Sequence, residues 1–236
     1  MDFENDPIGN AITDFQHGTV SQDIIVHSDL CEDDIMDVNY LFRSFENMPP
    51  IEKKALTMCK GKVLDVGAAA GCHAKWLNDN GFDILAIDTS EGAINYLKSL
   101  NLPSQKIDFH HLTEHKFDTI LLLMNGIGIA GRIKQIERFL IHAKSLLNPS
   151  GQIICDSTDI QYLYEDDEGA QWVDLNSQYY GEMEFQMEYK DSKTNWFPWL
   201  YIDFDTLSEK CSNLGLNAEL IMTSENNHFL AQITIL

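Results

Sequence analysis

Two acidic residues near the ends of predicted strands have the spacing of groups that act on one ligand. Asp65 lies in the strand-like run "KVLDV", and Asp88 ends the next such run, "FDILAID", 23 residues later. A carboxylate at a strand end can accept hydrogen bonds from both hydroxyls of a ribose, although Asp88 alone could equally cap the following helix. The interval is normal for a strand–helix–strand unit, so we expect both acids at one edge of a sheet.

The turn "GAAAG" between these acids fits two cofactor classes unequally. The dinucleotide pattern requires glycine at the first, third and sixth positions, which here are Gly67, Ala69 and Cys72. The alternative pattern, acid-x-Gly-x-Gly-x-Gly, falls on Asp65, Gly67, Ala69 and Gly71, with one departure at Ala69. The extra methyl group is tolerated if Ala69 has a negative φ, because left-handed backbone is what favours glycine.

The elements that position this turn alternate between strand and helix from Lys62 onward. Such alternation predicts a parallel sheet with right-handed crossovers. After Asp156, the runs "YYGEMEFQMEYK" and "TNWFPWLYID" predict a β-hairpin, and a helix follows over 205–214. The runs "AELIMTS" and "FLAQITIL" are too close in sequence for a helical crossover, so we expect them to pair in antiparallel fashion.

The acid-glycine turn and the antiparallel ending resemble class I methyltransferases that use S-adenosylmethionine. The resemblance covers roughly 60–236 and, through strings such as "LLLMNGIGIAG" and "LLNPSGQIICDSTD", extends to an uncharacterised bacterial subgroup. It implies an α/β, Rossmann-like, seven-stranded and mostly parallel sheet with an antiparallel last strand and helices on both faces. We expect a helical cap over 1–60 and a methyltransferase domain over 61–236, with a hairpin inserted at about 178–202.

The resemblance also implies which residues contact the cofactor. In this interpretation Asp65 lies beside the methionyl part, Asp88 binds the ribose, and Met124 and Asn125 face the methionine end and the acceptor. The full expected set is Asp65, Gly67, Ala68, Ala69, Gly71, Asp88, Thr89, His111, Leu112, Met124 and Asn125, together with Tyr40 and Arg43. From the cap, Tyr40 and Arg43 lie one helical turn apart, and Arg43 could pair with the cofactor's carboxylate or form an ordinary surface ion pair.

Methyl transfer needs a positioned acceptor, and it needs a base only where the acceptor must first lose a proton. The candidate catalytic residues are therefore few: Asn125, which ends the predicted strand "FDTILLLMN", and Asp156, which ends the predicted strand "QIICD". Gly126 and Ile127 follow Asn125, which disfavours the Asn-Pro-Pro-Tyr motif of nucleobase amine methylation. Asp156 could instead hold magnesium or cap a turn; we predict no metal. Trp196, Phe197, Trp199 and Tyr201 could wall an acceptor pocket or pack in the hairpin core.

Charge limits the partners of the chain. The 236 residues include 37 acids against 16 lysines and arginines, for a net charge of −21. We therefore expect neither nucleic acid nor anionic membrane as a partner, but a small, non-anionic acceptor. Five scattered cysteines, a polar N-terminus and the lack of a long apolar run predict a cytoplasmic protein. Two alternatives stay open: an NAD-dependent oxidoreductase, and a non-catalytic S-adenosylmethionine-binding module.

Overall fold

The computed structural model describes residues 5–164 and 179–236, so position 178, where the hairpin insertion was expected to begin, lies outside it. The α-helices are α1 Pro7–His17, α2 Pro50–Met58, α3 Cys72–Asp79, α4 Glu91–Ser99, α5 Ile136–Ser145 and α6 Phe204–Asn213. The strands are β1 Ile24–Ser28, β2 Asp34–Met36, β3 Lys62–Val66, β4 Asp83–Asp88, β5 Ser104–Lys106, β6 Phe117–Leu122, β7 Leu147–Thr158, β8 Glu182–Tyr189, β9 Ser192–Lys193, β10 Phe197–Leu200, β11 Leu216–Thr223 and β12 His228–Ile235.

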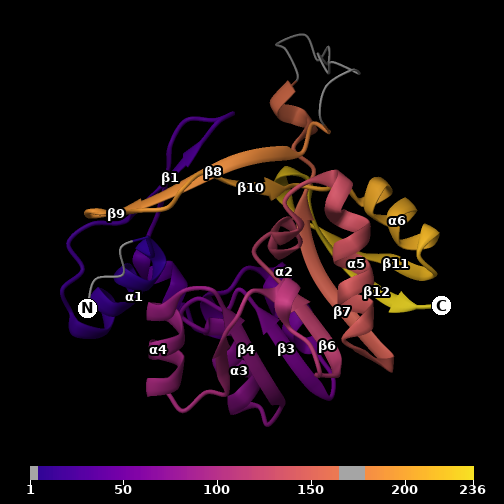
Figure 1. The fold of residues 1–236 in the computed structure, drawn as a ribbon, viewed down its shortest axis with the longest axis horizontal. Helices are drawn as coiled ribbons and strands as arrows, with labels where there is room; N and C mark the ends of the chain where they lie inside the picture. The colour runs from indigo at the N-terminus through magenta and orange to yellow at the C-terminus, as the bar shows by residue number, and fades with distance from the viewer. Residues whose placement is uncertain (1–4, 165–178) are drawn as a thin grey trace.

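A seven-stranded sheet forms the centre of the molecule, in the order β11-β12-β7-β6-β3-β4-β5 (Figure 1). The pairs β6–β7, β3–β6, β3–β4 and β4–β5 are parallel, whereas β12 runs antiparallel to both β7 and β11. The predicted mostly parallel sheet with an antiparallel last strand is therefore confirmed. Parallel strands end at one edge, so the segments that follow β3, β4, β6 and β7 come together there.

Side chains alternate across the strands and fill a core on each face of the sheet. On one face, Val63 and Leu121 pack with Leu77 of α3 and Leu97 of α4, in a cluster that also includes α2. On the other face, Leu64 packs with side chains of α5 and α6. Helices thus cover both faces, as predicted.

A second, antiparallel sheet covers the carboxyl ends of the central strands. Its order is β10-β8-β1-β2, with β9 paired to β8, and Figure 1 shows β1, β8 and β10 above β3, β4 and β6 in the view. The hairpin β8–β10 was predicted, but β1 and β2 were not. Ile25 of β1 lies opposite Glu188 of β8, a partner more than 160 positions away that no local pattern reveals.

Other elements differ from their predicted bounds for local reasons. The apolar run 38–48 forms short 3₁₀ turns instead of a helix, because Pro49 and Pro50 stop its extension. The α-helices of the segment 1–60 are α1 and α2. Helix α1 begins after Asp6, whose side chain accepts from the Gly9 N–H, and ends at the left-handed Gly18. Strand β5 ends at Lys106, before a 3₁₀ turn over Phe109–His111. Within the described ranges, none of the helices has both the length and the apolar character to cross a bilayer.

Candidate functional site

The turn after β3 is built by two glycines with different tasks. Gly67 has φ +72° and Gly71 has φ +77°, a left-handed region that favours glycine. A Cβ at Gly71 would lie 2.3 Å from the Leu97 side chain, so Gly71 allows α3 to pack on α4. A Cβ at Gly67 would meet only the Ile129 side chain, at 3.8 Å. Gly67 therefore leaves exposed backbone beside open space at the sheet edge.

The expectation for Ala69 was wrong. Its φ is +46°, not negative. The backbone N–H of Ala69 donates to Asp88 Oδ2 at 2.8 Å, and this bond holds the residue in the left-handed region. The methyl group packs against the cluster formed by α1, β1 and neighbouring residues. The turn thus keeps its shape without a middle glycine because Asp88 and the cap fix it from both sides.

Asp88 acts first as a structural acceptor. Its Oδ1 accepts from the Ser90 N–H at 2.8 Å, while its Oδ2 is bonded to Ala69. Burial raises the pKa of the Asp88 carboxyl, although these backbone N–H groups partly offset the effect. Each oxygen keeps a second lone pair, so these bonds do not preclude a ligand hydroxyl.

One carboxylate oxygen of Asp65 is buried without a hydrogen-bond partner in the described part of the chain. The residue is 2% exposed, and its Oδ2 has no hydrogen bond within the described residues. Burial raises the pKa of the Asp65 carboxyl, and the nearby His73 opposes that rise. A buried oxygen without a donor is costly, so this position is suited to a cationic or N–H-bearing ligand group.

The remaining predicted residues near β4 and β5 divide by exposure. Thr89 and His111 are exposed. Leu112 is 1% exposed and belongs to the core cluster under α5, so its side chain packs in the interior. The prediction that these three residues contact a cofactor stays a prediction.

Arg43 forms a buried ion pair rather than a surface one. Its Nε and Nη2 donate to Glu52 Oε2 at 3.1 and 2.7 Å, and its Nη1 donates to the Tyr40 carbonyl at 2.7 Å. The guanidinium lies 4.0 Å from the centroid of the Tyr40 ring, and Nη2 reaches Met124 Sδ at 3.2 Å. Arg43 thus connects the cap to the end of β6.

His73 joins this ion pair from the first turn of α3. Its Nε2 lies 2.9 Å from Glu52 Oε2. Burial favours neutral histidine, but the neighbouring Cys72, Glu52 and Asp65 outweigh it and raise the pKa of His73 to about 10. Glu52 and His73 were not predicted as site residues, because their sequence positions give no sign that they meet Arg43.

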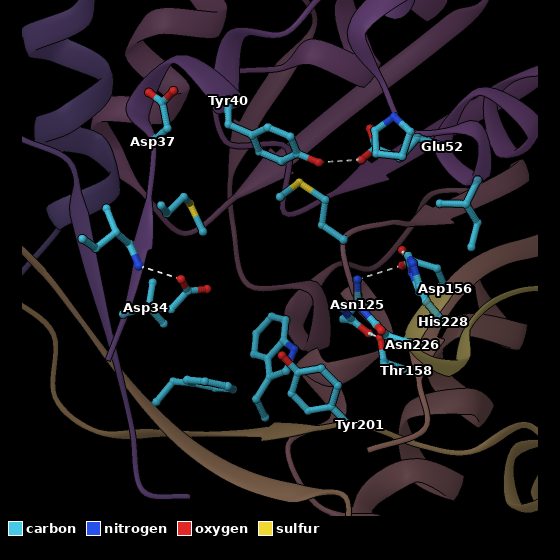
Figure 2. Close-up of a pocket in the computed structure, with 18 of the residues that line it drawn as sticks. Asp34, Asp37, Tyr40, Glu52, Asn125, Asp156, Thr158, Tyr201, Asn226 and His228 are labelled. Carbon is cyan, nitrogen blue, oxygen red and sulfur yellow. Dashed lines mark hydrogen bonds and ion pairs between the residues drawn. The ribbon is translucent and has the colours of Figure 1, made fainter. Parts of the chain in front are cut away.

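A cavity of about 1380 Å³ lies between the cap, the second sheet and the ends of β6 and β7. Of the predicted site residues, Tyr40, Arg43, Met124, Asn125 and Asp156 line it. The turn residues, Asp65, Asp88, Thr89, His111 and Leu112 do not. Figure 2 shows Tyr40 and Glu52 on one wall, with Asn125, Asp156 and His228 beside them and Tyr201 opposite Tyr40. The two predicted catalytic candidates therefore belong to this cavity.

Asn125 and Asp156 are in direct contact. The Asn125 N–H donates to Asp156 Oδ1 at 2.8 Å, and the Thr158 hydroxyl donates to Asn125 Oδ1 at 3.0 Å. Met124 and Asn125 both have positive φ, +61° and +55°, so the carboxylate stabilises an unfavourable backbone turn at the cavity wall. The other carboxylate oxygen lies 2.8 Å from His228 Nε2. His228 was also not predicted as a site residue.

The aromatic residues of the hairpin divide between wall and exterior. Phe197, Trp199 and Tyr201 line the cavity, while Trp196 is 49% exposed and does not. A Cβ at Gly128 would lie 2.1 Å from Trp199 Nε1, so Gly128 provides room for the indole. Within residues 5–164 and 179–236, no three His, Cys, Asp or Glu side chains converge as a metal site.

Comparisons with known proteins agree with this architecture. The sequence profile of a methyltransferase domain family matches residues 32–200. A crystal structure of a SAM-dependent methyltransferase from Bacteroides fragilis, in complex with S-adenosyl-L-homocysteine, is 39% identical. The alignment covers 100% of this chain and 97% of that one, with a TM-score of 0.92. A search of curated proteins returned no match.

More distant structures share the fold alone. The CcbJ methyltransferase from Streptomyces caelestis is 15% identical with a TM-score of 0.59, over 82% of this chain and 99% of that one. An S-adenosylmethionine-dependent methyltransferase from Clostridium acetobutylicum is 14% identical with a TM-score of 0.57, over 78% and 88%. By the extent of the profile match and the identity to the Bacteroides fragilis protein, the chain belongs to the methyltransferase domain family.

Proposed function

We propose that this protein transfers a methyl group from S-adenosylmethionine to a small, non-anionic acceptor. The family membership and the S-adenosyl-L-homocysteine in the 39% identical structure support the donor. The single observation that carries the proposal in this chain is the buried Asp65 Oδ2 that has no partner. The five cysteines are all free, which favours a reducing compartment for this activity.

The residues around the β3 turn fit the donor. Asp65 would accept from the methionyl ammonium, a charge-assisted hydrogen bond that satisfies the orphan oxygen. Exposed Gly67 allows close approach of the ligand, and Asp88 would accept from ribose hydroxyls with its second lone pairs. Bound there, S-adenosylmethionine supplies an activated methyl group. Met124, at the end of the adjacent β6, places the cavity next to this turn.

The cavity supports a non-anionic acceptor. Among its described lining residues, six are acids, namely Glu32, Asp34, Asp37, Glu52, Asp156 and Glu225, and one is an arginine. That arginine, Arg43, is paired with Glu52. Figure 2 shows the Asp34 carboxylate directed into the cavity, across from Asp156. An anion would therefore be repelled, while a neutral or cationic molecule with an apolar body could pack on Phe197 and Trp199. The same field disfavours nucleic acid.

A panel of cofactors tests the donor. We expect S-adenosylmethionine and S-adenosylhomocysteine to raise the midpoint of thermal unfolding, since a ligand at 100 times its dissociation constant adds about 2.7 kcal/mol. NAD⁺ and NADH should leave the midpoint unchanged. Stabilisation by the nicotinamide cofactors alone would identify an oxidoreductase. Donor binding without any transfer of labelled methyl to metabolite extracts would identify a non-catalytic binding module.

A further inference from the structure

A histidine and an aspartate on adjacent strands form a pair in the wall of the cavity described above. His228 begins β12 and lies opposite Thr158 of β7, and Asp156 lies two residues before Thr158. Because side chains alternate along a strand, His228, Thr158 and Asp156 project from the same face of the sheet. The contact between His228 and Asp156 therefore follows from the antiparallel register, which fixes the pair in place.

The pair has the arrangement of a histidine oriented by a carboxylate. Asp156 is 1% exposed, and its Oδ2 lies 2.8 Å from His228 Nε2. Its other oxygen accepts from the Asn125 N–H, so the carboxylate cannot rotate freely. An ionised carboxylate requires a donor, which places the proton of the neutral imidazole on Nε2 and the lone pair on Nδ1. Within the described residues, Nδ1 has no hydrogen-bond partner, and the imidazole lines the cavity.

We propose that His228 accepts a proton during methyl transfer and that Asp156 positions it. The substrate that receives the methyl group is then a protonated amine. This inference rests on the proposed function. A carboxylate acceptor would have no proton to give, and a neutral alcohol would gain no charge attraction from the acidic residues that line the cavity. An alkylammonium, with a pKa of about 10.4 as in lysine, must lose a proton before its nitrogen can attack.

The step balances with groups already named. Nδ1 of His228 takes one proton from the ammonium, and Asp156 stabilises the resulting imidazolium. The amine nitrogen then bonds to the donated methyl carbon, the carbon–sulfur bond breaks, and its electron pair remains on sulfur as a neutral thioether. The product is an N-methylated ammonium, and His228 returns its proton to solvent.

The charged surroundings of His228 favour a cation. Beyond Asp156 on β7, the charged groups of the neighbouring elements that line the cavity are Glu225, before β12, and Glu52 of α2, which is paired with Arg43. Asp34 of β2 faces the pair across the cavity (Figure 2). An ammonium can thus be held between carboxylates while its apolar body contacts the aromatic hairpin.

A panel of matched probes tests the substrate class. The protein and labelled S-adenosylmethionine are incubated with arylalkylamines and alkylamines of graded length, including 2-phenylethylamine, and with the corresponding alcohols and carboxylates. We expect label in amines alone. If S-adenosylhomocysteine binds but no amine is labelled, or if alcohols or carboxylates are labelled equally well, this inference is wrong and the proposed donor stands. If S-adenosylhomocysteine does not bind, the proposed function itself fails.

The pH profile tests the role of His228. With a labelled amine, His228→Gln should lower the single-turnover rate at pH 7 by about 100-fold or more, while S-adenosylhomocysteine affinity is retained. The loss should shrink as the pH rises toward that of amine deprotonation, and Asp156→Asn should show a smaller loss with the same trend. His17→Gln, an exposed histidine of α1, should match wild type. His228→Asn serves if the glutamine variant does not fold. An equal loss at every pH would mean a structural role and overturn the proposal.

Discussion

Glu52 receives two N–H groups of Arg43 on a single carboxylate oxygen, at 3.1 and 2.7 Å, with both side chains only 4% exposed. The same oxygen lies 2.9 Å from His73 Nε2. This one atom therefore ties the cap to α3, directly after the turn proposed to hold the donor. Burial would raise the pKa of the Glu52 carboxyl, but the hydrogen bonds and charges of His73 and Arg43 hold it below its usual value.

Removing the charge of Glu52 should destabilise the protein. Glu52→Gln leaves the Arg43 guanidinium buried without its counter-ion, and breaking a buried pair in this way costs about 3 kcal/mol. Urea unfolding measures the change. Glu46→Gln removes an exposed acid from the adjacent segment and should leave the free energy of unfolding unchanged. Equal stability of the two variants would contradict the importance of the pair.

His73 should make stability fall as the pH rises. Its pKa is about 10 in the folded protein and about 6.5 in the unfolded chain. Its contribution is complete below pH 6.5 and is lost between pH 6.5 and 10, because the folded state retains a proton that the unfolded state has released. The slope of the free energy of unfolding can reach about −1.4 kcal/mol per pH unit.

Urea titrations at pH 7 and pH 9 check this dependence. His73→Gln should remove the part of the decline that the imidazole causes, whereas His17→Gln should retain it. A decline that is as steep in the His73 variant as in wild type would mean that other groups produce it.

The strained Ala69 offers a stabilising substitution. At φ +46°, the Cβ atom costs roughly 1 kcal/mol, and the greater entropy of unfolded glycine offsets about half of that or more. Ala69→Gly should therefore raise the free energy of unfolding by a few tenths of a kcal/mol. Ala68 is 7% exposed, belongs to the core under α3 and α4, and is not among the residues with positive φ. Ala68→Gly should therefore destabilise. Thermal unfolding of Ala69→Gly and Ala68→Gly measures both effects. An equal loss of stability in the two variants would contradict backbone strain at Ala69.

Local sequence patterns predicted the central sheet because the residues that define each strand, and the short connection between the last two strands, are close together in sequence. The run "KVLDV" became β3 over Lys62–Val66 without a shift, since Val63, Leu64 and Val66 are apolar and the run ends at a glycine turn. The antiparallel pairing of β11 with β12 followed from the short connection between them. Asp65 and the end of β6 were located by the same reasoning, because parallel strands end at one edge.

The rest of the site depends on contacts between distant segments. The sheet over the cavity requires β1 to pair with β8, and the sequence of neither strand indicates that partner. His228 is separated from Asp156 by 72 positions and meets it only through the β7–β12 register. The left-handed φ of Ala69 depends on a hydrogen bond to Asp88 and on packing of α1, so the turn pattern alone gave the wrong sign.

The most direct test of the account is calorimetric titration of S-adenosylhomocysteine into wild type, Asp65→Asn and Asp83→Asn. Both variants lose one negative charge, but Asp83 is exposed at the start of β4, at the opposite end of the sheet from the turn. We predict that wild type and Asp83→Asn bind alike and that Asp65→Asn, although folded, binds at least tenfold more weakly, because a charge-assisted hydrogen bond to the ammonium is lost. Equal binding by all three proteins, or no binding by wild type, would contradict the central claim.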